Sequence, residues 1–166
     1  MIAFGKDGKA YLLDRNKLGG IGGPATIVPV SNQQIITAAA IYSTPTLDSV
    51  VFTNGNPIGC SHPGLMMLSL TPSGSSPITT AWCAPYSGNG APIITTTDGV
   101  SNPIVWVVGA EGDAQLHGFN ALTGAAVYTS PQGLAGLHRF QTLISAGGRL
   151  YVAGNNAVYG FVFTPG

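Results

Sequence analysis

Short apolar runs alternate with polar turns along the whole chain, and two forms of run recur in a fixed order. The first form is an apolar run that closes on glycine, found at residues 2–5, 51–55, 105–109 and 150–154. The second form follows it as a five-residue strand with apolar residues at its first, third and fourth positions, found at residues 10–14, 65–69, 116–120 and 158–162. Successive copies of the second form begin 55, 51 and 42 residues apart. A repeat of this length is typical of propeller blades or solenoid units.

The runs predict strands rather than helices, because glycine or proline interrupts nearly every window long enough for a helix. Short β-branched and aromatic segments bounded by Gly, Pro, Asn and Ser are typical of β-strands. Pro45 predicts a start or break within its strand, and residues 19–23 are predicted to form a turn. The strands fall into groups of three, four, four and three, at residues 2–4, 10–14 and 26–30; 41–47, 50–53, 65–70 and 78–82; 92–96, 104–108, 115–120 and 125–129; and 141–145, 149–153 and 157–163.

This grouping predicts an all-β fold, a partial β-propeller of about four four-stranded antiparallel blades with the first and last blades incomplete. Blades pack face to face, which agrees with the continuous apolar runs of the second strand in each group. We expect a single domain over residues 1–166, with blades at about 1–30, 41–82, 91–130 and 138–163. A flat solenoid is the alternative, although its repeats are usually shorter.

Composition narrows the classes of function. Only 7% of the residues are charged, the net charge is zero and no basic stripe is present, which argues against nucleic acid as a partner. No apolar run is long enough for a transmembrane segment. Sparse charge with many Ser, Thr, Asn and Gly residues favours an exported protein. We therefore expect a periplasmic or extracellular location, with any signal lying outside this chain.

Two stretches resemble a known family. Residues 5–14, GKDGKAYLLD, and residues 116–124, LHGFNALTG, are similar to the repeat of the pyrroloquinoline-quinone-like (PQQ-like) β-propellers. That repeat has a tryptophan a few residues beyond its Thr-Gly turn, where this chain has Tyr128. Because the family's propellers have seven or eight blades, the resemblance implies that the chain is a C-terminal fragment of a longer protein.

The resemblance also implies where an enzyme of the family would hold its quinone and calcium, namely on acidic, Asn and Arg side chains at the propeller axis. The chain has six Asp and Glu residues, and Asp7, Asp14 and Asp113 fit turn positions of the repeat. No cluster suited to calcium is evident, and the adjacent cysteine pair of some quinoprotein dehydrogenases is absent. We therefore predict no catalytic, cofactor-binding or metal-binding residues and no cofactor.

The three histidines do not share a motif. His117 falls within a strand at a position where the other copies have Tyr or Met, which indicates a packing role, while His62 and His138 fall in loops. Trp106 is expected in the core. Tyr86 lies in a predicted loop between blades, and aromatic residues on propeller loops often meet ligands. Tyr86 and His62 are the candidate ligand-facing residues.

The two cysteines, Cys60 and Cys83, are predicted to lie on one face of one blade. Cys60 falls in the loop between the second and third strands, and Cys83 follows the fourth strand. A loop folded over the third strand would bring them within bridging distance, which requires Cα atoms within about 7 Å. Two unrelated thiols are the alternative. A disulfide would indicate an oxidising compartment.

These features favour a non-catalytic PQQ-like propeller module that acts as a scaffold or binding surface, for a protein or small ligand that the sequence does not name. One alternative is a fragment of a PQQ-dependent quinoprotein dehydrogenase. A second is a carbohydrate- or surface-binding module, which rests on the loop aromatics. Incomplete end blades expose strand edges and apolar faces, so we also expect self-association.

Overall fold

The computed structural model describes residues 1–17, 23 and 26–163 as β-strands and loops. Of the glycine-rich turn expected at residues 19–23, only Gly23 is among these residues. The strands of the first two sheets are β1 (Ile2–Phe4), β2 (Lys9–Leu12) and β3 (Thr26–Pro29), then β4 (Ala40–Ser43), β5 (Asp48–Asn54), β6 (Gly64–Leu70) and β7 (Ile78–Pro85). The last two sheets contain β8 (Ile93–Thr95), β9 (Ile104–Val108), β10 (Leu116–Asn120) and β11 (Ala126–Thr129), then β12 (Leu143–Ala146), β13 (Arg149–Ala153) and β14 (Val158–Val162).

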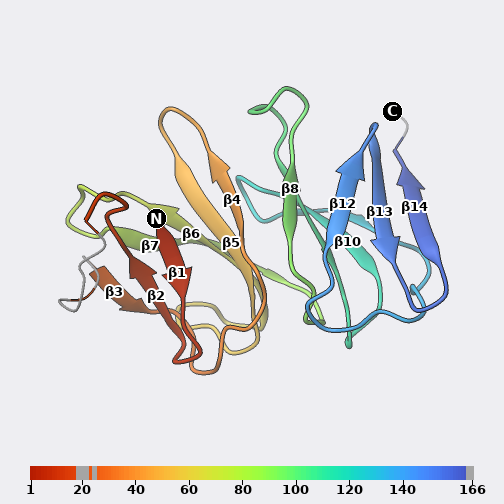
Figure 1. The fold of residues 1–166 in the computed structure, drawn as a ribbon, viewed down its shortest axis with the longest axis horizontal. Helices are drawn as coiled ribbons and strands as arrows, with labels where there is room; N and C mark the ends of the chain where they lie inside the picture. Colours follow the sequence, from red (N-terminus) through yellow and green to blue (C-terminus); the bar gives the residue numbers. More distant parts are fainter. Residues whose placement is uncertain (18–22, 24–25, 164–166) are drawn as a thin grey trace.

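The strands of the described residues form four antiparallel sheets of three, four, four and three strands, and in each sheet the strands lie in sequence order. Figure 1 shows how the sheets are arranged along the molecule. Neighbouring strands in the chain are neighbours in the sheet throughout, so every connection within a sheet is a hairpin. The chain is all-β, and its sheets are the blades of a partial β-propeller whose first and last blades are incomplete. The grouping expected from the sequence is confirmed.

Each pair of neighbouring sheets shares its own apolar core. In the middle strands, successive side chains point to opposite faces, so one strand serves two cores. Val50 and Phe52 of β5 pack toward the first sheet, while Val51 between them packs toward the third. Trp106 and Val108 of β9 likewise pack toward the fourth sheet. This is why these strands read as continuous apolar runs, and it confirms Trp106 as a core residue.

Trp82 of β7 joins the second sheet to the third. Its indole Nε1 donates a hydrogen bond of 2.8 Å to the carbonyl oxygen of Ala121, in the turn after β10. Its ring lies against Gly124 of the same turn. A Cβ atom added to Gly124 would come within 2.8 Å of the indole, and the φ angle of Gly124 is +73°. Tyr42 adds a second link, because its hydroxyl donates to the carbonyl of Val100 at 2.7 Å.

Two details of the predicted strands differ in the structure. The strand predicted at residues 41–47 ends at Ser43, so the break expected at Pro45 is present. Pro45 lies in the β4–β5 hairpin turn, where Thr44 and Leu47 are bonded backbone to backbone and Thr44 Oγ1 accepts from Leu47 N at 3.0 Å. Proline has no N–H to give to a sheet, so the turn accommodates it without loss. Cys83 does not follow the fourth strand but lies within it, since β7 continues to Pro85.

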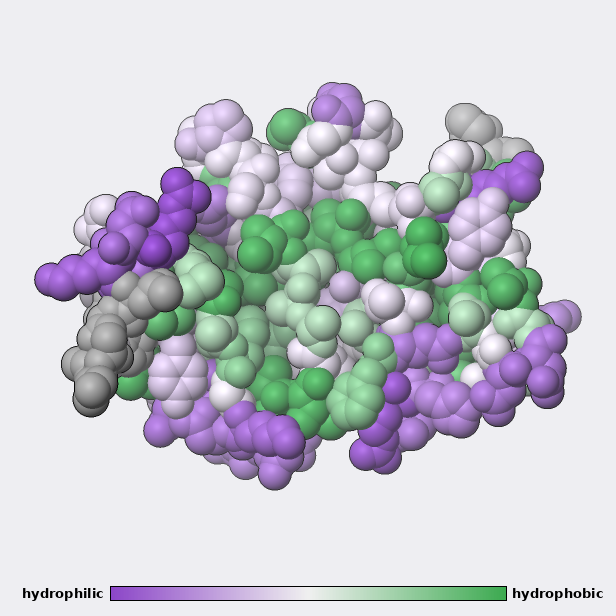
Figure 2. Space-filling model, in the orientation of Figure 1, coloured by the Kyte–Doolittle hydropathy of each residue, from purple (hydrophilic) through white to green (hydrophobic). Residues whose placement is uncertain are grey.

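The two end sheets each leave one face without a neighbour among the described residues. Ile144, Val158 and Val162 of the last sheet are 65%, 71% and 63% exposed. Figure 2 shows apolar residues across the middle of the visible face and hydrophilic ones along its lower rim. In the described part of the chain, no helix has the length and apolar character needed to cross a membrane.

Candidate functional site

A groove lies at the joint between the second and third sheets, and we call it the joint groove. It consists of two hollows that share Tyr86 and Pro63 in their walls. The larger hollow has a volume of about 450 Å³, and the smaller about 300 Å³. The larger one is lined by His62, Pro63, Pro85, Tyr86, Asp113, His117, Phe119, Ala126 and Thr129. The two residues expected to face a ligand, Tyr86 and His62, therefore line the same hollow.

One wall of the joint groove is the loop at residues 55–63, which a disulfide holds in place. Cys60 and Cys83 are bonded, with their Cα atoms 6.0 Å apart. Cys83 lies opposite Met66 of β6, so the loop reaches β7 by folding over the intervening strand. Cys60 also packs against the apolar core between the first and second sheets. The bridge thus fixes His62 and Pro63 beside the groove.

The facing wall is the tight turn at residues 109–115, between β9 and β10. Gly112 lies directly against the preceding loop, where an added Cβ would come within 2.2 Å of the Ser87 carbonyl oxygen. The same carbonyl accepts from Asp113 N at 3.2 Å. Glu111 and Ala114, on either side of Asp113, have φ angles of +57° and +59°. Such left-handed conformations are costly for non-glycine residues, so packing on both sides must hold this turn in one shape.

Asp113 and His117 form the polar centre of the joint groove. His117 Nε2 lies 3.0 Å from Asp113 Oδ2 and 3.1 Å from Oδ1, and since a carboxylate only accepts, Nε2 is the donor. The other ring nitrogen, Nδ1, lies 3.5 Å from the hydroxyl of Thr129. His117 itself is 8% exposed. His117 is buried, as its predicted packing role requires, and it also contacts the Asp113 carboxylate.

The first sheet repeats this arrangement at the equivalent position. Asp7 lies in the turn before β2, and its carboxylate accepts from the Tyr11 hydroxyl and from Lys9 N. Asp113 likewise accepts from Gln115 N, at 3.0 Å. In both copies a turn aspartate therefore bonds its own turn and the side chain four residues later. The turn roles predicted for Asp7 and Asp113 agree with these bonds, as does that of Asp14, which accepts from Asn16 N at 2.9 Å.

Tyr86 separates the two hollows and is anchored at its hydroxyl. The hydroxyl lies 2.6 Å from Thr53 Oγ1, and the Tyr86 ring meets the His117 ring edge-on at 5.8 Å. Burial raises the pKa of the Tyr86 phenol well above its usual value, and the charge of Asp113 acts in the same direction while the Thr53 hydrogen bond opposes it. The phenol therefore stays neutral throughout the physiological range.

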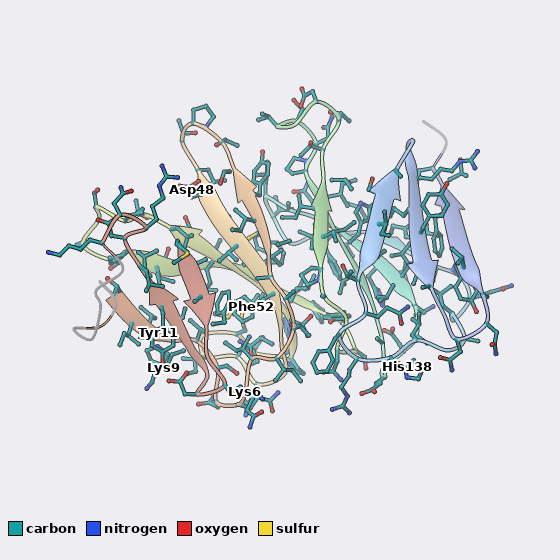
Figure 3. All side chains as sticks on the ribbon, viewed as in Figure 1. Lys6, Lys9, Tyr11, Asp48, Phe52 and His138 are labelled. Carbon is teal, nitrogen blue, oxygen red and sulfur yellow. A yellow bond between two sulfur atoms is a disulfide. The ribbon has the colours of Figure 1, made fainter. Side chains whose placement is uncertain are left out.

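Other charged and histidine side chains lie at the edges of the site. Glu111, in the wall of the smaller hollow, is paired with Arg139 at 2.8 Å, and this contact lowers the pKa of the Glu111 carboxyl. His138 bonds Asn155 at 2.7 Å and lies on the lower rim of the molecule (Figure 3). Within the described residues, no three His, Cys, Asp or Glu side chains are grouped as metal ligands.

Sequence reasoning missed part of the site. It found Tyr86 and His62 as loop residues, but it treated Asp113 and His117 separately and did not single out Phe119 or Thr129. A signal was present, since an acidic residue stands four positions before the strand residue in two of the copies, Asp7 to Tyr11 and Asp113 to His117. The approach of Tyr86, from the second sheet, to His117 of the third is set by packing, which the sequence pattern does not specify.

Comparisons with known proteins found matches among solved structures. No protein-family model matches the sequence, and no curated protein matches it. The solved structures that match include BamB from Moraxella catarrhalis. That crystal structure is 19% identical, with a TM-score of 0.46 over 97% of this chain. The chain spans 57% of the length of that protein.

Proposed function

We propose that this chain is a non-catalytic propeller module of the PQQ-like kind, and that it binds a partner in the joint groove. The observation that carries this proposal is the groove itself, a shallow and open depression with apolar and aromatic walls and a few polar groups at its centre. Apolar and aromatic walls with a few placed polar groups are the usual lining of a binding site.

The state of the polar groups favours binding over catalysis. Both ring nitrogens of His117 are engaged inside the protein, one with Asp113 and the other with Thr129. The Tyr86 hydroxyl is engaged with Thr53, and its raised pKa keeps it from acting as a base. Proton transfer needs a group whose pKa lies near the working pH and which can reach its substrate. These side chains are arranged as rigid walls instead.

The disulfide supports an oxidising location for this module. Bridges of this kind form and persist in secreted, periplasmic and extracellular proteins and are rare in the cytosol. A periplasmic or extracellular location is therefore part of the proposal. A wall that depends on a disulfide would also keep its shape best in such a compartment.

The test is a nuclear magnetic resonance titration with short capped peptides that represent each class of side chain. Binding should shift the signals of Tyr86, His117 and Thr129 in a saturable way. Ala126→Trp should block the larger hollow, because Ala126 lines it and is exposed. Val127→Trp is the matched control, since Val127 is the next residue of β11, is 53% exposed and does not line the hollow.

The enzymatic alternative has a separate test. We expect pyrroloquinoline quinone with calcium to bind more weakly than about 1 µM, which corresponds to about −8 kcal/mol. Tighter binding, measured by the quinone absorbance on titration, would contradict the non-catalytic proposal. Peptide shifts that Ala126→Trp and Val127→Trp leave equally intact would remove the joint groove as the binding site.

A further inference from the structure

We infer that the joint groove takes an extended polypeptide segment of a partner protein and seats an arginine side chain of that segment against Asp113. The inference rests on the proposed function and adds the chemistry of the occupant to it. Charge, hydrogen-bonding capacity and the shape of the walls each point to this occupant.

The joint groove carries an acidic group at its centre. The formally charged groups along the joint groove are Asp113 and Glu111, with Arg139 beside them. Glu111 is paired with Arg139 by two contacts of 2.8 and 2.9 Å. The negative charge of Glu111 is therefore neutralised locally. Among the described residues, His117 is the basic side chain in contact with Asp113, and His62 lines the opposite wall. The Asp113 carboxylate is therefore a groove charge with which no described lysine or arginine pairs, and it can receive an incoming cation.

The Asp113 carboxylate has hydrogen-bonding capacity that the described residues do not use. A carboxylate offers about four acceptor positions. Asp113 Oδ1 receives Gln115 N and shares His117 Nε2 with Oδ2. The Asp113 side chain remains 30% exposed, so acceptor positions face the hollow. Charged donors form the strongest hydrogen bonds with such an acceptor.

Three rings, those of Tyr86, His117 and Phe119, lie in a row beside the Asp113 carboxylate. The Tyr86 and His117 ring centres are 5.8 Å apart, and those of His117 and Phe119 are 6.1 Å apart and nearly parallel. Such a row gives an apolar bed for the stem of a long basic side chain while its head reaches the carboxylate. Arginine fits better than lysine, because its planar group stacks on rings and pairs with a carboxylate through two donors.

The two hollows and the neighbouring edge strand favour an extended ligand. The two hollows lie on either side of Tyr86, which gives room for more than one side chain. Ala126 and Thr129, which line the larger hollow, belong to β11, the end strand of its sheet. An edge strand offers backbone groups to an extended segment, and alternate side chains of that segment then point to one face. An extended polypeptide can fill both hollows and pair with the edge strand, whereas a small amine would contact only the Asp113 carboxylate.

The experiment compares capped peptides that differ at one residue, arginine or citrulline, by calorimetry and by magnetic resonance shifts at His117 and Thr129. Citrulline keeps the size of arginine and lacks its charge. We expect the arginine peptide to bind at least about tenfold more tightly, as a hydrogen bond between charged groups warrants. Asp113→Asn should remove this preference. Asp7→Asn, the same turn position in the first sheet, is the matched control and should keep it.

Each outcome decides the inference. If both peptides bind at the groove with equal affinity, the arginine assignment is wrong while the binding module stands. If neither peptide shifts the groove signals, both proposals fall. If Asp7→Asn loses the preference as fully as Asp113→Asn does, the effect is general and the assignment to Asp113 is wrong. If Asp113→Asn unfolds, the inference is still tested by two measurements: the arginine and citrulline peptides on the unaltered chain, and the arginine peptide on Ala126→Trp.

Discussion

Reduction of the Cys60–Cys83 bridge should destabilise the chain by an amount that can be worked out from its loop. The two residues are 23 positions apart, so the bridge closes a loop of about that length in the unfolded chain. In the chain-entropy model, such a loop corresponds to about 3.4 kcal/mol at 25 °C. Both sulfur atoms remain in place after reduction, so packing around Cys60 changes little and the loss comes mainly from the unfolded state.

The assay is urea unfolding of the same preparation with and without reductant, followed by tryptophan fluorescence. The unfolding free energy should fall by about 3 kcal/mol on reduction, and the melting temperature by roughly 6 to 12 °C for a chain of this size. The double variant Cys60→Ala/Cys83→Ala is the control and should not respond to reductant. Two free thiols in the unreduced, denatured protein would refute the bridge, and equal stabilities with and without reductant would refute the loop argument.

Three further predictions concern the joint, the tyrosine and the end sheets. Trp82→Phe should cost about 1–3 kcal/mol in urea unfolding, because the buried Ala121 carbonyl loses its donor; no loss would show that the indole bond is dispensable. Burial raises the pKa of the Tyr86 phenol above 10.0 in the folded state. The contribution of the neutral phenol to the unfolding free energy is therefore complete below pH 10, and it is lost as the pH rises through the pKa of the folded state. Tyr86→Phe should therefore flatten the alkaline loss of stability, and an unchanged profile would argue against a buried phenol. At tens of micromolar (roughly the range in which exposed strand edges associate), light scattering should detect oligomers, and Ile144→Lys on the exposed end face should reduce them; a monodisperse monomer would contradict self-association.

The sequence predicted the strand groups well because each strand carries a local signal. Glycine and aspartate mark the turns, and the runs between them are β-branched or aromatic. The strand ends near Pro45 and Cys83 were misplaced by a few residues because strand ends depend on hydrogen bonds to neighbouring strands. Trp82 ends the strand predicted at residues 78–82, but its bond to Ala121 joins two sheets and leaves no local pattern. The joint groove was missed for the same reason, since Asp113 and Tyr86 meet only when the second and third sheets pack together.

The three separate cores have a consequence for how the chain opens. Among the described residues, each sheet packs on its immediate neighbours, so the four sheets form an array whose ends are expected to open locally before the whole chain unfolds. The end sheets each have one neighbour and should exchange their amide hydrogens first. The second and third sheets have neighbours on both sides, and Trp82, Tyr42 and the disulfide are concentrated there. The joint groove therefore lies in the slowest-exchanging part of the array, where a ligand meets a surface that is already ordered.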